Sequence, residues 1–165
     1  PVGAVIVTEV MQNPAAVSDN DGEWFELHNT TGSSIDLDGC ELSDDDGLDH
    51  TIAGSLVVGG GGYLVLATEA DPALNGGFSV DYEYGGGLNL TNGDDEVILS
   101  CGGLQIDRVG WDDGATFPDP TGASMSLAPA YLDQYANDDG AHWCEATSTF
   151  GAGDQGTPGS ANDPC

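Results

Sequence analysis

Two stretches of the sequence decide the fold class, and they read Val5-Ile6-Val7-Thr8-Glu9-Val10-Met11-Gln12-Asn13-Pro14 and Gly22-Glu23-Trp24-Phe25-Glu26-Leu27-His28-Asn29. Both are dense in β-branched and aromatic residues, which favour β-strands. The residues between them are rich in Pro, Ser, Asn, Asp and Gly, which favour turns. Two strands are therefore predicted, over residues 4–11 and 23–29.

The same alternation of short apolar runs and turn residues continues along nearly the whole chain. Further strands are predicted over residues 34–42, 50–52, 62–68, 80–84, 96–101, 104–111 and 123–127. Helical periodicity is nearly absent, and only residues 129–135 favour a helical turn. Many short strands separated by turns are typical of a β-sandwich or barrel. An all-β protein is predicted.

The strand pattern also predicts which side chains fill the core. Apolar residues alternate along the predicted strands, as expected where two sheets pack face to face. These core candidates are Trp24, Leu27, Ile35, Leu37, Leu42, Leu64, Leu66, Val97, Leu99, Val109 and Trp111. A chain of 165 residues is long enough for one such core, so residues 1–165 are predicted to form a single domain.

The charge balance is extreme. Arg108 is the one basic residue against 29 acidic residues, and the formal net charge is −28 at pH 7. Nucleic acids and anionic membrane surfaces are bound mainly through Lys and Arg, so neither is expected as a partner unless metal ions bridge. A compact polyanion repels itself and loses stability unless cations bind to it. The composition therefore implies divalent cations or high salt.

The four cysteines, Cys40, Cys101, Cys144 and Cys165, are widely spaced and form no CxxC pair. Disulfides are therefore favoured over a zinc ribbon or a redox site. The chain begins with Pro1 and shows no apolar leader, as expected of a secreted protein whose signal peptide has been removed. No apolar stretch approaches the roughly 20 residues that span a bilayer. An extracellular, soluble protein is expected.

Two acidic loops offer oxygen ligands for a metal ion. They read Asp19-Asn20-Asp21-Gly22-Glu23 and Asp44-Asp45-Asp46-Gly47-Leu48-Asp49, and the candidate calcium ligands are Asp19, Asp21, Glu23, Asp44, Asp46 and Asp49. Calcium typically takes about six to eight oxygen ligands from such loops. Neither loop has the EF-hand spacing, and the alternative is that both merely hydrate the surface. The net charge favours calcium as a bound cofactor.

The order of the strand motifs resembles that of lamin tail domains. Besides the two opening stretches, the motifs are Ile35-Asp36-Leu37-Asp38-Gly39-Cys40-Glu41-Leu42-Ser43-Asp44, Gly62-Tyr63-Leu64-Val65-Leu66, Leu88-Asn89-Leu90-Thr91-Asn92-Gly93-Asp94-Asp95-Glu96-Val97-Ile98-Leu99, Asp107-Arg108-Val109-Gly110-Trp111, Ala123-Ser124-Met125-Ser126-Leu127 and Gly156-Thr157-Pro158-Gly159-Ser160-Ala161-Asn162. Each motif is weak, but the ordered set is specific and covers nearly the whole chain.

This resemblance implies an immunoglobulin-like β-sandwich. In secreted bacterial proteins it implies a non-catalytic module, sometimes appended to nucleases or other hydrolases. The coiled-coil heptads and the basic import segment of animal lamins are absent, so their assembly mechanism does not transfer. The resemblance also implies that Trp24 and Trp111 are buried, and that His28 stands where the family has a polar strand residue.

The positions of the cysteines favour two bridges, Cys40 with Cys101 and Cys144 with Cys165. The first would cross-link strands, and the second would tie down a C-terminal tail at about residues 140–165 that is rich in Gly, Pro and Asn. Sequence alone leaves the connectivity open, and pairing between chains remains an alternative.

Candidates for catalysis are few. His28, His50 and His142 stand in unrelated segments, outside any HExxH motif, and no serine occupies GxSxG. All three histidines are interpreted as ordinary surface or edge residues, and no enzyme activity is predicted. Trp143 is expected to pack on the bridge of the neighbouring Cys144. A sugar-stacking platform formed by the three tryptophans is the alternative to core packing.

Together these observations predict a non-enzymatic, secreted structural or adhesive module that is stabilised by cations. Its expected partners are copies of itself or cell-surface and matrix components. Residues 2–11 or 156–165 could pair with a neighbour's sheet edge and build extracellular filaments or a surface layer. The alternative function is a glycan-binding, carbohydrate-binding accessory module of a secreted hydrolase system. An enzyme comes third.

Overall fold

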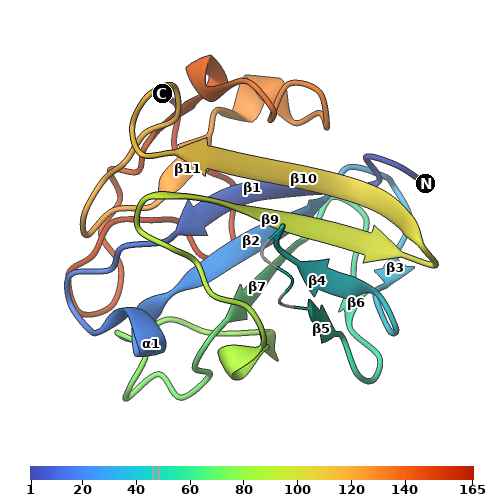
Figure 1. Ribbon diagram of the computed structural model, residues 1–165, viewed down its shortest axis with the longest axis horizontal. Coiled ribbons are helices and arrows are strands. Elements are labelled where there is room, and N and C mark those ends of the chain that lie inside the picture. The colour runs from blue at the N-terminus through green and yellow to red at the C-terminus, as the bar shows by residue number, and fades with distance from the viewer. Residues whose placement is uncertain (46, 48) are drawn as a thin grey trace.

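The computed structural model of the chain describes every residue except 46 and 48, and of Asp49 it describes the backbone alone. The described chain is built almost entirely from β-strands, which form two main sheets packed face to face. Figure 1 shows β9, β10 and β4 crossing in front of β1, β2 and β7. The C-terminal part of the chain, orange to red, gathers at the top and left of this view. The prediction of an all-β protein is confirmed.

The larger sheet has six strands in the order β12-β11-β1-β2-β7-β8. Its strands are β1 (Val5–Met11), β2 (Trp24–Asn29), β7 (Tyr63–Ala67), β8 (Tyr82–Glu83), β11 (Met125–Leu127) and β12 (Trp143–Glu145). All neighbours pair antiparallel except β7 and β8, which are parallel. The two stretches that open the sequence therefore become the central strands of this sheet.

The smaller sheet has four strands in the order β10-β9-β4-β5. Its strands are β4 (Glu41–Ser43), β5 (Asp49–Thr51), β9 (Asp94–Cys101) and β10 (Leu104–Asp112). A two-residue turn joins β9 to β10, and both of its residues, Gly102 and Gly103, have positive φ of 61° and 75°. Such a turn matches the twist of the flanking strands and requires residues that tolerate positive φ. A separate ribbon pairs β3 (Ile35–Asp36) with β6 (Val57–Val58).

The main hydrophobic core joins side chains from both sheets. Ten of the eleven predicted core residues are buried, and Ile35 is partly buried against the same core. Trp24 is buried as predicted, but in a different place from the other core candidates. It belongs to a second buried cluster with Met11, Val65, Ala67 and Phe78, rather than to the core between the sheets.

Strand periodicity explains the location of Trp24. Side chains alternate between the faces of a strand, so Trp24, Glu26 and His28 share the face of β2 that points away from the smaller sheet. The ring of Trp24 lies 5.7 Å from that of Phe78 and 6.0 Å from that of Phe150. This outer face is therefore covered by loops and by the C-terminal part of the chain.

Several predicted elements are shorter or divided in the structure. The predicted strand 34–42 is two strands, β3 and β4, because Gly39 adopts a φ of 75° in a turn where Cys40 N donates to the carbonyl of Leu37. The predicted strands 80–84 and 123–127 shrink to β8 and β11. The short strands β6 and β12 were not predicted.

The helical elements are single turns. They are α1 (Asp19–Gly22), η1 (Gly85–Gly87), η2 (Pro129–Tyr131) and η3 (Gly140–His142). The helical turn expected at residues 129–135 is confirmed as η2, whereas α1 falls in a segment predicted as a loop. Within the described residues, no helix is long and apolar enough to cross a membrane.

Candidate functional site

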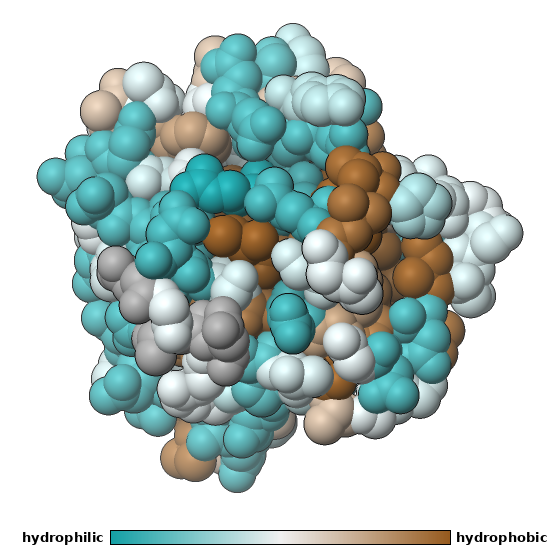
Figure 2. Space-filling model, turned by 45° about the vertical axis from the view of Figure 1, so that its right-hand side comes forward, coloured by the Kyte–Doolittle hydropathy of each residue, from teal (hydrophilic) through white to brown (hydrophobic). Residues whose placement is uncertain are grey.

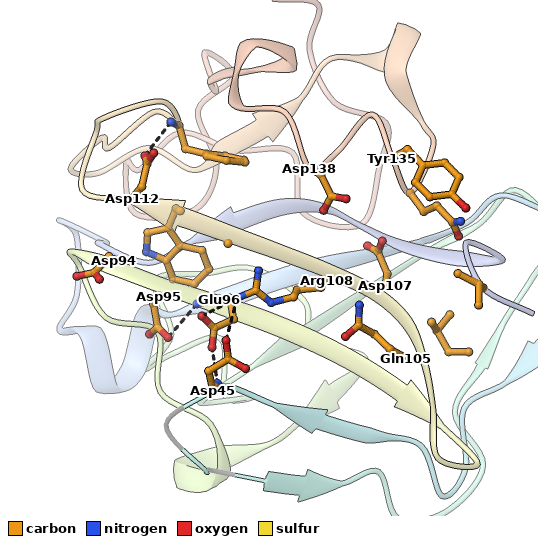
Figure 3. A pocket seen from close by; sticks show the side chains of 16 residues that line it. Asp45, Asp94, Asp95, Glu96, Gln105, Asp107, Arg108, Asp112, Tyr135 and Asp138 are labelled. Carbon is orange, nitrogen blue, oxygen red and sulfur yellow. Dashed lines mark hydrogen bonds and ion pairs between the residues drawn. The ribbon is translucent and has the colours of Figure 1, made fainter.

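An open groove of about 650 Å³ runs along β10, and it is the candidate functional site. Figure 3 shows β10 crossing its centre, with Arg108 on one side and Asp138 and Tyr135 on the other. The carboxylates that line this groove are Asp45, Asp94, Asp95, Glu96, Asp107, Asp112 and Asp138. Its walls therefore come from both strands of the β9–β10 hairpin, from residue 45 and from residues 134–138.

Arg108 is the single basic side chain of the protein, and it lies in this groove. Its Nη2 donates to Asp45 Oδ2 at 3.0 Å and to Glu96 Oε2 at 3.2 Å. Glu96 in turn accepts a hydrogen bond from the backbone N–H of Asp45. The groove thus already holds one guanidinium between two carboxylates, a geometry that charge-assisted hydrogen bonds favour.

Asp107 is the most buried carboxylate of the groove, with a residue exposure of 4%. Its Oδ2 accepts hydrogen bonds from Val7 N at 2.7 Å and from Asn137 Nδ2 at 2.8 Å. The carbonyl of Asn137 accepts from the indole of Trp143 at 2.9 Å. Loss of solvation raises the pKa of Asp107 to about 7. Asp107 therefore links β10 to β1 and holds the loop that forms the far wall.

Two further carboxylates anchor loops at the end of the groove. Asp112 accepts from the Thr116 hydroxyl at 2.6 Å and from the backbone N–H of Phe117 at 3.0 Å, and these bonds hold its pKa below the usual value. Asp95 accepts from Thr91 N at 2.6 Å, although burial raises its pKa. These acids stabilise local structure as well as charging the surface.

The rim of the groove carries an exposed aromatic ring. Tyr135 has an exposure of 77%, the highest of the exposed large apolar side chains, whereas Trp111 and Phe117 line the groove from buried positions. Val2, exposed to 49%, also lines the groove, and the neighbouring Gly3 lies against Gln134. Figure 2 shows hydrophobic side chains gathered on the right half of the face in view, with hydrophilic residues around them.

The first predicted calcium loop does not direct all its ligands to one point. Glu23 turns inward with an exposure of 4%, and its Oε2 accepts from Leu90 N at 3.3 Å. Burial raises the pKa of Glu23 to about 8. Asp19 accepts from Asn92 Nδ2 at 3.1 Å, and Asp21 from the Ser18 hydroxyl at 2.8 Å.

The second predicted loop, between β4 and β5, is described only in part. Asp44 is buried at 7% exposure, and its neighbour Asp45 pairs with Arg108. Asp46 and the side chain of Asp49 lie outside the description. Among the residues that are described, no group of three or more His, Cys, Asp or Glu side chains converges as a metal site would require. Calcium binding stays a prediction.

A second polar cluster, which the sequence did not predict as a site, lies on the outer face of the larger sheet. Glu9 is fully buried there and accepts hydrogen bonds from the hydroxyls of Ser124, Ser126 and Thr157 and from Thr157 N. Glu26, opposite Glu9 on β2, is also fully buried. Loss of solvation and then the charge of Glu9 raise the pKa of Glu26 to about 9.

A bulge in β1 helps to build this cluster. The register between β1 and β2 shifts between Val7 and Glu9, so Thr8 is the extra residue and can share a face with Glu9. The Thr8 hydroxyl donates to Glu26 Oε1 at 2.9 Å. Two consecutive polar side chains of β1 therefore reach the same face.

The C-terminal tail closes this cluster from outside. Gly159 N donates to Glu26 Oε2 at 2.9 Å. The side-chain amide of Asn162 donates to the carbonyls of Thr8 at 2.7 Å and Leu127 at 2.9 Å. At Gly156 a Cβ would lie 3.0 Å from the rings of Trp24 and Phe150, so a glycine is needed for this close approach. The motif at residues 156–162 thus forms a lid over β1 and β2.

Both predicted disulfides are confirmed. Cys40 is bonded to Cys101, which links β4 to β9, and Cys144 is bonded to Cys165, which fastens the C-terminus to β12. The described chain has no free cysteine.

The histidines are held by structural contacts. The interpretation of His28 as a surface or edge residue is wrong, because β2 lies inside the larger sheet and His28 is 7% exposed, stacked 4.4 Å from Tyr63. Burial lowers its pKa. His50 Nε2 lies 2.8 Å from the Tyr82 hydroxyl, and His142 stacks on the ring of Tyr131 at 3.7 Å.

The tryptophans do not form an exposed platform. Trp24, Trp111 and Trp143 are buried, with exposures of 5% or less. Trp143 joins the main core, where its ring lies 6.0 Å from Phe117. Burial of Trp24 and Trp111 is confirmed.

Two sheets that pack face to face around one apolar core, with antiparallel pairing throughout except at β8, define an immunoglobulin-like β-sandwich. Comparison with protein families adds a specific assignment. The model of the Lamin Tail Domain family matches residues 1–113, so the chain belongs to that family. The motifs at 123–127 and 156–162 lie beyond the matched residues. A comparison with curated proteins found no match.

Proposed function

We propose that this domain is a non-enzymatic, secreted binding module with a structural or adhesive role. The observation that carries the proposal is the groove along β10, where the longest strand of the fold forms the edge of its sheet beside an uncovered, charged surface. An unpaired strand edge offers backbone donors and acceptors to a partner.

The contacts of the titratable groups support a role without catalysis. Each histidine contacts a tyrosine, as described above. Asp107, whose raised pKa would suit an acid catalyst, uses its carboxylate to hold Val7 and Asn137. Catalytic groups instead need access to a substrate.

Secretion is supported by the two disulfides, because such bonds persist mainly in oxidising compartments. Residues 1–165 act as a single unit in this proposal. In support, the main core includes residues from Val5 to Trp143, and the tail that follows packs on the larger sheet.

The partners proposed are cell-surface or matrix components, and also copies of the chain where cations screen the charge. Two segments expected to join neighbours are engaged within the protein itself: β1 is an interior strand, and residues 156–162 cover the larger sheet. Filaments or a surface layer would therefore form through other sheet edges, such as that of β8. Bound calcium would reduce the repulsion between chains of charge −28.

A carbohydrate-binding accessory role is the second candidate. Tyr135, exposed to 77% beside the carboxylates of the groove, is the observation that favours it. Sugar rings stack on exposed aromatic side chains and accept hydrogen bonds from, or donate them to, neighbouring polar groups.

Negative-stain microscopy with calcium and with EDTA, combined with glycan and matrix-protein arrays, tests the proposal. Binding to a cell-surface or matrix component, or calcium-dependent filaments, supports it. Dispersed particles that bind glycans alone support the carbohydrate-binding role. A chain that neither assembles nor binds any component of the arrays overturns both.

A further inference from the structure

We propose that the groove along β10 binds an extended peptide segment bearing Lys or Arg, which adds as a strand to the free edge of β10. This inference deepens the proposed binding function and rests on it. It names the class of partner as a basic segment of another protein.

The free part of the β10 edge is its second half. Over the first half, Gly3 N donates to the carbonyl of Ile106 at 2.8 Å, and the Asp107 side chain accepts from Val7 N. From Arg108 to Asp112 the described chain places no strand beside β10 other than β9. Arg108, Gly110 and Asp112 line the groove. About five residues of edge, roughly 16 Å at the usual rise of a strand, are therefore open to a partner.

The charge of the groove requires a basic occupant. Seven carboxylates line it, against the single guanidinium of Arg108. A second copy of this chain would bring a charge of −28 and no unpaired arginine, because the one arginine already contacts Asp45 and Glu96. The same contacts show that the groove can hold a guanidinium between two carboxylates.

The arrangement of the carboxylates distinguishes a peptide from a metal ion. No three of the described acids converge as ligands of one ion. They are instead distributed along the groove, from Asp45 and Glu96 on one wall to Asp138 on the other (Figure 3). Separated negative charges match a ligand whose positive charges are separated too, as they are on alternate residues of an extended peptide.

Tyr135 and Gly110 complete the match. The ring of Tyr135 stands exposed at the rim, where the face of an aromatic ring attracts a lysine or arginine side chain. Gly110 leaves the groove without a side chain at the middle of the open edge. A Cβ built there meets its nearest atoms at 3.5 Å, which is ordinary contact, so the glycine is not required by packing against its own chain.

The test uses three short peptides of equal length on the folded, oxidised protein. The first alternates Lys with Thr, the second alternates Lys with Pro, and the third alternates Glu with Thr. Calorimetry at about 50 mM and about 500 mM NaCl measures affinity, and hydrogen exchange maps protected amides. We expect the Lys-Thr peptide to bind, more weakly at high salt, and to protect amides within residues 108–112. The Lys-Pro peptide, which lacks alternate backbone N–H groups, should bind on the order of tenfold more weakly.

Matched variants separate this site from the general charge of the surface. Asp94→Asn with Asp138→Asn removes two exposed carboxylates of the groove. Glu41→Gln with Glu145→Gln removes two exposed carboxylates that do not line it. The first pair should lower the affinity for the Lys-Thr peptide about fivefold, and the second pair should lower it less than about twofold.

Three results would overturn the inference. They are a Lys-Pro peptide that binds as tightly as the Lys-Thr peptide, an equal loss of peptide affinity in both variant pairs, or a groove that binds a glycan and no peptide. Adhesion to a matrix or cell-surface component that survives Asp94→Asn with Asp138→Asn would also overturn it. That last result would leave the proposed adhesive function standing, so the two failures are distinguishable.

Discussion

Glu9 and Glu26 stand opposite each other on the neighbouring strands β1 and β2, and both carboxylates are fully buried. Burial raises the pKa of Glu9, and the hydrogen bonds that it accepts from three hydroxyls and one backbone N–H oppose that rise. Glu26, with a pKa raised to about 9, retains its proton at neutral pH. Because burial raises the pKa of both carboxyl groups, the pair retains at least one proton beneath the C-terminal lid at neutral pH.

The first prediction is a pH-dependent effect of Glu26→Gln. The folded state binds the proton of Glu26 more tightly than the unfolded chain does, so this residue contributes its full stabilisation below about pH 4.5. That stabilisation is lost as pH rises through about 9. Glutamine resembles the protonated acid and has no such dependence. Urea unfolding should show the variant gaining stability relative to the wild type as pH rises from about 5 to about 9.

The variant Glu145→Gln, which removes an exposed carboxylate from another strand of the same sheet, is the control. A pH-independent difference for Glu26→Gln would show that Glu26 is ionised at neutral pH. Glu23 and Asp107 also have raised pKa values from burial, so the wild-type protein itself should lose stability as pH rises through about 7 to 8.

The second prediction concerns the lid. Asn162→Ala should lower the free energy of unfolding by about 1 to 3 kcal/mol, because it leaves two buried backbone carbonyls, those of Thr8 and Leu127, without their donor. Ser160→Ala removes an exposed hydroxyl in the same tail and should change stability by about 0.5 kcal/mol or less. Chemical denaturation compares them, and equal effects would contradict the role of Asn162.

The third prediction distinguishes the contribution of the packed ring of Trp24 to stability from the effect of its indole N–H. The ring is fully buried, and its indole N–H has no hydrogen-bond partner in the described structure. Trp24→Ala should therefore cost about 3 to 5 kcal/mol of unfolding free energy through lost packing. Trp24→Phe removes the unpaired N–H and retains most of the ring contacts, so it should cost clearly less. Thermal and denaturant unfolding measure both, and a cost below about 1 kcal/mol for Trp24→Ala would place the ring outside the packed cluster.

The fourth prediction concerns calcium. A site that binds only the folded state adds about 2.7 kcal/mol when free calcium is about a hundredfold above its dissociation constant. Millimolar calcium should therefore raise the melting temperature more than NaCl of matched ionic strength does, and EDTA should reverse the rise. Asp19→Asn with Asp21→Asn, or Asp44→Asn with Asp46→Asn, should remove most of the increment, unlike the control Glu41→Gln with Glu145→Gln.

If dissolved salt only screens the repulsion between the acidic side chains, the result differs from that of a calcium site. Sodium and calcium would then act in proportion to ionic strength, and removal of any pair of surface acids would stabilise the protein in either salt. That pattern would show that the two acidic loops only hydrate the surface.

Periodicity and composition predicted the longer strands and most of the core, but not β6 and β12. The positions of the cysteines favoured the two observed bridges, although the sequence left their connectivity open. Alternating apolar residues such as Phe25 and Leu27 mark the face that packs between the sheets. The same alternation assigns Glu26 to the opposite face, where a strand-based argument expects solvent. Strict alternation would place Glu9 on the face of Val5 and Val7, and only the bulge at Thr8 brings it opposite Glu26. Alternation cannot show that residues 156–162, more than a hundred positions later, cover both carboxyl groups.

The groove was unpredictable for a similar reason. Its walls join residue 45, strands β9 and β10 and residues 134–138, which only the tertiary structure brings together. Asp107 looked like one acid among many, because its burial depends on contacts with Val7 and Asn137. A local signal did exist for the lid, since charged residues in the middle of the apolar runs of β1 and β2 require buried partners if anything covers that face.

The position of Arg108 also affects the resistance of the protein to proteolysis. Enzymes of the trypsin type cut after Lys or Arg, and this chain offers them one such bond in 165 residues, that between Arg108 and Val109. That bond lies within β10, and its guanidinium is held by Asp45 and Glu96. A protease of this type must therefore open the β9–β10 hairpin before it can cut. A disulfide would hold the two fragments together only if the cut fell inside the loop that the disulfide closes. Arg108 lies between the two disulfide loops, so no disulfide spans the cut. Against proteases of this type, the integrity of the chain therefore depends on the protection of this one peptide bond.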